Sequence, residues 1–105
     1  MKTLIILSFV MLTLSSVAQV IVPDLSKKED LQSLGIGKIF EKDNSIIKNI
    51  QITEVKEYGI VYLKNESTHD IAKETISRIE FLESKWGKIK IEFKNNKPEV
   101  SWLHY

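Results

Sequence analysis

The stretch IIKNIQITEVKEYGIVYL, residues 46–63, decides the fold. It contains two runs rich in β-branched residues, 46–55 and 60–63, separated by a short connection that ends in Gly59. Apolar residues at two-residue spacing are typical of a strand with one buried face. The short connection predicts an antiparallel hairpin, in which the glycine supplies the positive φ that a tight turn often needs.

Pairing inside this hairpin predicts where the core lies. The residues that recur at two-residue spacing, and that we expect on the core face, are Ile50, Ile52, Val61 and Leu63. We expect Val55 to lie opposite Ile60, a register that places Ile52 across from Leu63. Val55, Ile60 and Tyr62 then gather on the other face. A sheet that is apolar on both faces must be covered twice or curl on itself.

Residues 64–67, Lys-Asn-Glu-Ser, predict a second tight turn, because asparagine tolerates left-handed backbone. This turn would place Tyr62 opposite His69 and Ile60 opposite Ile71. The three strands would then form a meander.

The segment over residues 70–86 fits two structures. As a helix, it has an apolar face from Ala72 to Trp86 and ends at Gly87. As a strand, it begins with a bend at residues 73–75 and then alternates apolar and charged side chains up to Phe81. We predict the strand, because isoleucine and threonine suit a pleated surface. A helix over residues 70–86 is the alternative.

The N-terminal flank predicts a helix over residues 24–34, a strand over residues 37–41 with Ile39 inward, and a turn at residues 43–45. Ser26 and Glu29 have the spacing of a capping box. Leu31 and Leu34 lie on one face of this helix, and Gly35 ends it.

The C-terminal flank predicts a hairpin. The strand over residues 88–94 turns Ile89, Ile91 and Phe93 inward, and residues 95–98 form the turn. The expected pairs are Phe93 with Val100, Ile91 with Trp102, and Ile89 with His104. A competing register turns Leu103 and Tyr105 inward, so only one of Trp102 and Leu103 is expected in the core.

The predicted fold is therefore mainly β: a small antiparallel curled sheet or barrel-like meander of five to seven strands with a short N-terminal helix. The order of the segments 46–55, 59–63, 68–71 and 76–81 resembles small curled sheets of the Sm-like barrel kind. This resemblance covers under half of residues 19–105 and assigns no functional residue. The RNA binding that it implies disagrees with the charge and the predicted export of the chain.

The N-terminus predicts export. Lys2 precedes an apolar run over residues 4–14, and Ser16 and Ala18 stand at the positions that a signal peptidase reads. A retained membrane anchor, the alternative, needs about 20 apolar residues. We predict a signal peptide over residues 1–18 and one small β-rich domain over residues 19–105, located in the periplasm or outside the cell, with no stable membrane insertion after cleavage.

Charge and cysteine content narrow the function. The chain has 15 basic and 14 acidic residues, and loss of Lys2 with the signal peptide leaves equal numbers of each. A nucleic-acid binder would show a basic excess, so we expect no nucleic-acid partner. The chain contains no cysteine, so its core must be stable without disulfides.

Catalytic signatures are missing from the sequence, which lacks a Gly-x-Ser-x-Gly turn, a cysteine nucleophile, a phosphate-binding glycine loop and an HExxH pair. We therefore predict no catalytic residue, no metal and no cofactor. The alternative is a small metal-dependent or hydrolytic enzyme that uses His69 with Glu66 or Asp70, joined by His104 if the tail folds back. A hairpin edge with His69 covering Tyr62 is the simpler interpretation.

Aromatic side chains are the other candidate surface. Tyr58, Trp86 and Tyr105 are amphipathic anchors of the kind used in recognition, and Trp86 is expected at a partly exposed hairpin tip. Trp102 is expected in the core. The sequence thus predicts an exported, non-enzymatic binding or accessory module, such as an inhibitor or envelope interaction protein. Its partner is expected to be a protein, with carbohydrate as the second choice.

Overall fold

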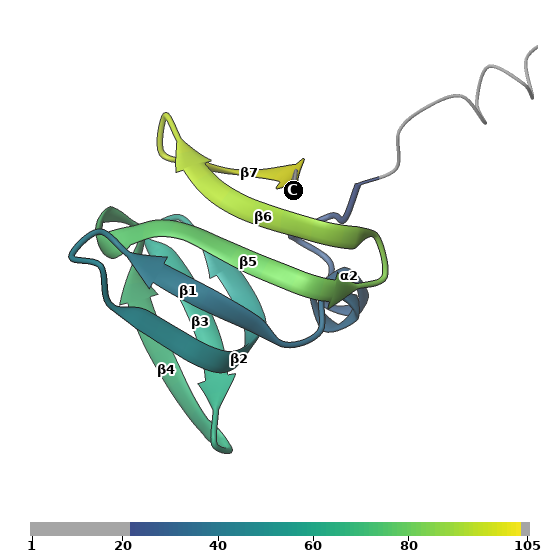
Figure 1. Ribbon diagram of the computed structural model, residues 1–105, viewed down its shortest axis with the longest axis horizontal. Coiled ribbons are helices and arrows are strands. Elements are labelled where there is room, and N and C mark those ends of the chain that lie inside the picture. The colour runs from purple at the N-terminus through teal and green to yellow at the C-terminus, as the bar shows by residue number, and fades with distance from the viewer. Residues whose placement is uncertain (1–21, 104–105) are drawn as a thin grey trace, which may run out of the picture.

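The computed structural model describes residues 22–103, which form one open sheet of seven antiparallel strands in the order β4-β3-β2-β1-β5-β6-β7 (Figure 1). The strands are β1 (Gly37–Glu41), β2 (Ile46–Lys56), β3 (Gly59–Lys64), β4 (Ser67–Ala72), β5 (Ile76–Ser84), β6 (Gly87–Lys94) and β7 (Lys97–Trp102). The short helix α2 (Lys28–Ser33) precedes them, and the 3-10 turn η1 (Lys73–Thr75) joins β4 to β5.

This architecture confirms the mainly β prediction, including the bend at residues 73–75 followed by a strand. The alternative helix over residues 70–86 is wrong. The predicted signal peptide, His104 and Tyr105 lie outside the described residues.

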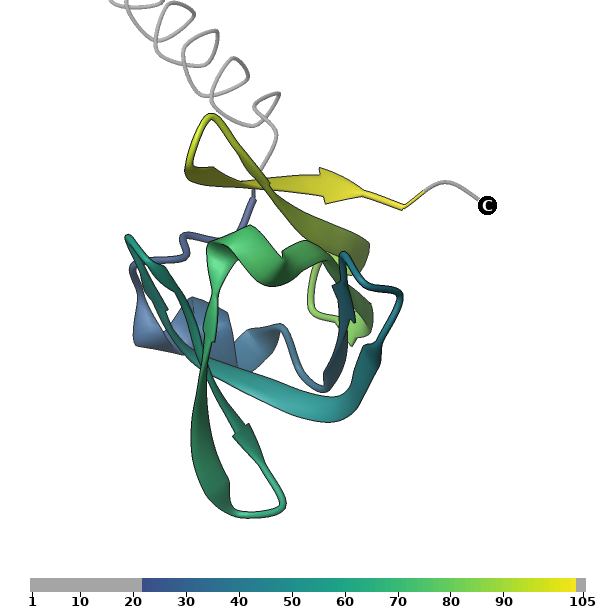
Figure 2. The ribbon, with the colours of Figure 1, turned by 90° about the vertical axis from the view of Figure 1, so that its left-hand side faces the viewer.

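The curl of the sheet depends on β2. Its first half pairs with β1 and its second half pairs with β3, so this long strand links the two parts of the sheet (Figure 2). Val55 lies opposite Ile60, as predicted. Ile52, however, lies opposite Tyr62 and not Leu63, because the register shifts between Ile52 and Glu54. A bulge of this kind bends a strand and increases its twist.

Because of the bulge, the residues that face the core differ from those predicted. The extra residue changes the alternation of β2, so both Ile52 and Val55 pack against the core. Across the hairpin, Ile60 and Tyr62 join them. Val61 is buried as predicted but lies outside this cluster, and Leu63 is only partly buried. The strongest predictions, Ile50 and Ile52, are confirmed as buried.

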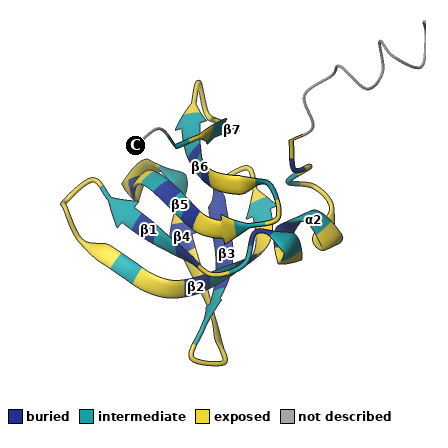
Figure 3. Cartoon of the chain, turned by 45° about the vertical axis from the view of Figure 1, so that its right-hand side comes forward, coloured by how far each residue is buried: buried dark blue, intermediate teal, exposed yellow. Residues whose placement is uncertain are grey.

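One hydrophobic core fills the inside of the curl, and Figure 3 shows the buried stretches of neighbouring strands side by side. Its fully buried members with the largest side chains are Phe81, Leu34, Ile39, Ile50, Ile52, Ile60, Ile79, Ile89 and Ile91. The core therefore reaches from α2 across β1 and β5 to β6.

Helix α2 is shorter than predicted, and its capping box is absent. The Ser26 hydroxyl donates to Asp24 Oδ1 at 2.6 Å, and the Ser26 N–H donates to the same oxygen at 3.0 Å. Lys27 is the N-cap, without a side-chain hydrogen bond. Leu31 and Leu34 are buried and Gly35 ends the helix with φ of 76°, as expected.

Gly59 has a different role from the one predicted. It lies in β3 without a positive φ, and the turn consists of Glu57 and Tyr58. A Cβ on Gly59 would collide with the carbonyl oxygen of Ile71 on the neighbouring strand. Close packing of β3 against β4 therefore explains the glycine, not turn geometry.

The β3–β4 and β6–β7 hairpins each have an asparagine in a two-residue turn. Tyr62 pairs with His69 as predicted, across a turn with positive φ at Asn65 and at the residue that follows it. Asn95 and Asn96 form an equivalent two-residue turn, which replaces the predicted four-residue turn.

This shorter turn moves the register of β7 by two residues. The observed pairs are Phe93 with Pro98, Ile91 with Val100, and Ile89 with Trp102. Each residue keeps its face, because side chains alternate with a period of two. Neither Trp102 nor Leu103 is buried, so the prediction that one of them is core is wrong.

Candidate functional site

Tyr58 occupies the turn between β2 and β3, with 46% of its surface exposed. Its carbonyl oxygen accepts a hydrogen bond from the Lys73 N–H at 2.8 Å, and its hydroxyl donates to Asp70 Oδ2 at 3.3 Å. Lys56 lies near the ring, with its Nζ atom 5.7 Å from the centroid. Tyr58 is thus held beside the start of η1.

Trp86 occupies the turn between β5 and β6, at the partly exposed hairpin tip expected from the sequence. The backbone N–H of Trp86 donates to Ser84 Oγ at 3.2 Å, and the Ser84 hydroxyl donates to the Gly87 carbonyl oxygen at 2.5 Å. Gly87 has φ of 98°, which a residue with a side chain rarely adopts. The turn therefore fixes the backbone of Trp86, while its side chain packs against the edge of the core.

Tyr58 and Trp86 lie at opposite ends of β5. Tyr58 bonds to Lys73, which precedes the strand, and Trp86 follows its last residue. A strand rises about 3.3 Å per residue, so β5 separates the two aromatic residues by roughly 25 to 30 Å. The structure does not bring them together in one site, and the third predicted member, Tyr105, is outside the described residues.

Trp102 lies next to Trp86 instead. The Trp102 indole N–H donates to the Trp86 carbonyl oxygen at 3.4 Å, and 37% of the Trp102 surface is exposed. Lys85 Nζ lies 5.8 Å from the centroid of the Trp86 ring. We name Lys85, Trp86 and Trp102 the tryptophan patch. It combines two amphipathic aromatic side chains with a cationic rim.

The sequence assigned Trp102 to the core, whereas the structure places it on the edge strand β7, at a position that a shorter turn than predicted determines. Two consecutive asparagines are typical of a two-residue turn with positive φ, and that signal would have placed Trp102 opposite Ile89. Ile89 is covered by strands on both sides, whereas Trp102 belongs to the edge strand β7. An edge residue on the core face remains partly open to solvent.

The side chains of the alternative catalytic cluster, His69, Glu66 and Asp70, do not converge. His69 stacks on Tyr62, with ring centroids 5.3 Å apart. Asp70 follows it in β4 and therefore points to the opposite face of the sheet. Glu66 lies in the turn, with φ of 66°. Burial, and secondly the Glu41 carboxylate, raise the pKa of Tyr62.

Within residues 22–103, no group of three or more His, Cys, Asp or Glu side chains lies close enough together to hold a metal ion. None of the polar or charged side chains in this range is buried.

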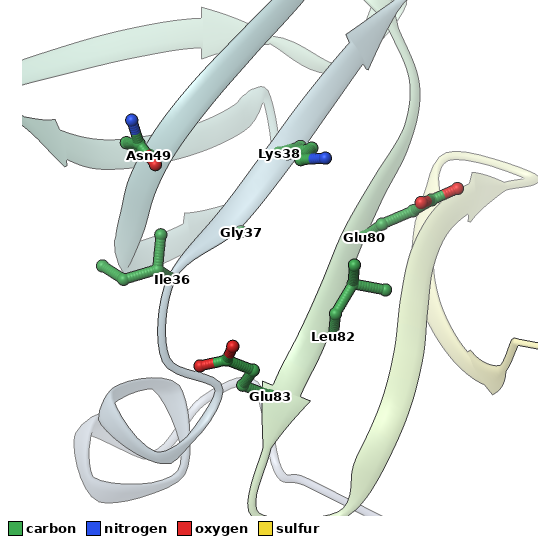
Figure 4. A pocket seen from close by; sticks show the side chains of 7 residues that line it. All are labelled: Ile36, Gly37, Lys38, Asn49, Glu80, Leu82 and Glu83. Carbon is green, nitrogen blue, oxygen red and sulfur yellow. The ribbon is translucent and has the colours of Figure 1, made fainter.

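A shallow depression of about 250 Å³ lies on the outer face of the sheet and is lined by Ile36, Gly37, Lys38, Asn49, Glu80, Leu82 and Glu83 (Figure 4). Ile36 and Leu82 are its exposed apolar side chains. Glu80 points away from Ile36 and pairs with Arg78 at 2.6 Å. The depression is open and only partly apolar, unlike the concave and mostly apolar shape of a typical small-molecule site.

None of the described helices is long and apolar enough to span a membrane. Comparisons of the chain with protein family models, with curated proteins and with solved structures give no match.

Proposed function

We propose that this chain is an exported, non-enzymatic binding module that contacts a protein partner through the tryptophan patch. The observation that carries the proposal is the contact between Trp86 and Trp102. These two residues are at least partly exposed and come from different hairpins, and the Trp102 indole N–H donates to the backbone carbonyl oxygen of Trp86.

The patch is suited to recognition because its aromatic side chains are held in place. Ser84 orders the backbone of Trp86, and the Trp86 carbonyl orders the ring of Trp102. Ordered tryptophans lose little conformational entropy on binding and dominate many interfaces. Lys85 adds a charge at the rim, where steering and specificity arise.

A protein partner is favoured over a carbohydrate by the hydrogen-bonding state of the patch. Sugar recognition requires free donors and acceptors beside the aromatic face. The Trp102 indole N–H is already donated to the Trp86 carbonyl oxygen, and the Trp86 backbone N–H is donated to Ser84 Oγ. The Trp102 ring therefore offers mainly apolar surface, and the Trp86 backbone offers no free donor. Export itself is supported by the signal-peptide pattern of residues 1–18.

The proposal is tested by affinity capture with residues 19–105 as bait, followed by titration of the identified partner. Trp86→Ala should reduce affinity by roughly tenfold or more, as hot-spot substitutions do. Tyr58→Ala is the matched control, because it removes an exposed aromatic side chain at the other end of β5. Circular dichroism and urea unfolding establish that both variants fold.

Three results would contradict the proposal. One is equal affinity of Trp86→Ala and the unmodified chain, and the second is loss of binding only in His69→Ala. The third is stoichiometric zinc bound through His69, which would restore the enzyme interpretation. Binding of glycans but not of proteins to the patch would instead show that the partner is a carbohydrate.

A further inference from the structure

The sheet is open, so β4 and β7 each have one edge that pairs with no other described strand. Exposed strand edges are templates for pairing with another chain unless charges, proline or bulges block them. Figure 2 shows the β3–β4 hairpin projecting away from the rest of the sheet. The two edges differ in how well they are protected.

Hairpin geometry shows which backbone groups of β4 point outward. The two-residue turn makes Lys64 and Ser67 the first hydrogen-bonded pair, and hydrogen bonding toward β3 then alternates along β4. Thr68 and Asp70 therefore direct their N–H and C=O groups away from β3. The bond from the Lys73 N–H to the Tyr58 carbonyl continues this alternation.

The same geometry applies to β7, where Pro98 takes the position that Thr68 has in β4. Proline has no N–H, so it removes an outward donor at no cost to the bonds with β6. Lys97 and Glu99 flank it with charged side chains. The edge of β7 is thus blocked against strand addition, and the edge of β4 has no proline.

We propose that β4 is a homodimer interface, in which two copies of the chain pair their β4 strands antiparallel about a two-fold axis at His69. Thr68 of each copy then lies opposite Asp70 of the other. Their outward N–H and C=O groups form four backbone hydrogen bonds. This inference does not use the tryptophan patch and stands independently of the proposed function.

Charge and hydrogen bonding exclude the other registers in which two β4 strands could pair. A register centred on Asp70 places two carboxylates directly opposite each other, and one centred on Thr68 places Asp70 opposite Glu66. Like charges in these positions destabilise a strand pair. A register centred on Ile71 needs the Ala72 carbonyl, which already accepts from Thr75 Oγ1 at 2.8 Å.

The register centred on His69 avoids these conflicts. It sets the Thr68 hydroxyl beside an Asp70 carboxylate on one face, a favourable cross-strand pair. On the other face it brings together two His69 rings, each already stacked on its own Tyr62. Residues 19–105 carry equal numbers of acidic and basic residues, so no net charge opposes association of two copies.

An interface made by a six-residue strand buries less than the roughly 1,200 Å² of a typical stable interface, so the dimer should be weak. Sedimentation velocity over protein concentrations from about 10 μM to about 1 mM therefore tests the proposal. We expect a concentration-dependent dimer for the unmodified chain and only monomer for Thr68→Pro, which copies Pro98. Thr68→Val is the matched control, because it keeps the N–H and should still dimerise. A monomer throughout this range, or a dimer in folded Thr68→Pro, would overturn the proposal.

Disulfide trapping tests the register even if Thr68→Pro fails to fold. The chain has no cysteine, so His69→Cys introduces a single thiol. Opposed residues of a non-hydrogen-bonded pair have Cα atoms about 4.5 Å apart, within reach of a disulfide. Mild oxidation should cross-link His69→Cys at least tenfold faster than Asp70→Cys. Equal or faster cross-linking of Asp70→Cys, or none at His69→Cys, would overturn the register.

Discussion

Truncation of Ile91 to alanine tests the core that the strand pattern predicts. Ile91 is fully buried and lies between Ile79 and Val100 on the inner face of the sheet. The change removes three carbon atoms, which costs about 2.4 kcal/mol at about 0.8 kcal/mol for each buried methylene. The cavity left behind brings the expected loss to roughly 2 to 5 kcal/mol. A domain of this size has about 4 to 13 kcal/mol of stability, so the loss is a large part of the total.

Urea unfolding followed by circular dichroism measures this loss. Lys90→Ala is the control, because Lys90 is the neighbouring residue on the outer face and pairs with Glu92 at 3.4 Å. A partly exposed ion pair of this kind contributes at most about 1 kcal/mol. Equal loss of stability in Ile91→Ala and Lys90→Ala would refute the inward and outward alternation of β6.

Three further predictions concern the packing of Gly59, the turn at Asp24 and the N-terminus. Gly59→Ala should destabilise the chain by more than about 1 kcal/mol in urea unfolding, because the new Cβ collides with the Ile71 carbonyl; unchanged stability would refute this packing. The Ser26 hydroxyl is the main cause that lowers the pKa of Asp24, so Ser26→Ala should raise that pKa toward 3.8 in an NMR titration, whereas an unchanged midpoint would contradict the contact. The stabilising effect of this contact is present above pH 3.8 and is lost as the pH falls through the lower folded-state pKa. The exported product should begin at Gln19, and an intact mass that retains residues 1–18 would exclude the signal peptide.

Local patterns predicted most of the sheet. Alternation of apolar and charged residues located β6, and the asparagine turn at residues 65–66 fixed the pairing of β3 with β4. The strand over residues 76–84 was preferred to a helix on β propensity alone, and the structure confirms it. These features depend on neighbouring residues, so the sequence contains the information directly.

The features that could not be predicted depend on packing between residues far apart in the sequence. The bulge between Ile52 and Glu54 lies where β2 stops pairing with β1 and starts pairing with β3, and no residue type at this position predicts it. The role of Gly59 depends on how closely Ile71 approaches from another strand. The likeness to Sm-like sheets stays a prediction.

The candidate site was predicted in part. Trp86 lies at a hairpin tip as expected, because Gly87 with its positive φ ends the turn. Trp102 was missed because its exposure depends on β7 being the last strand of the sheet. Its position next to Trp86 is a consequence of register, which the two-residue turn at Asn95 determines.

Fluorine NMR of the chain labelled with 5-fluorotryptophan tests the binding surface most directly. The chain has only two tryptophans, Trp86 and Trp102, so both resonances report on the tryptophan patch. The Trp86→Phe variant assigns them. Addition of the captured protein partner should shift or broaden both resonances in proportion to the bound fraction. Two unchanged resonances at saturation with the partner would contradict binding through this patch.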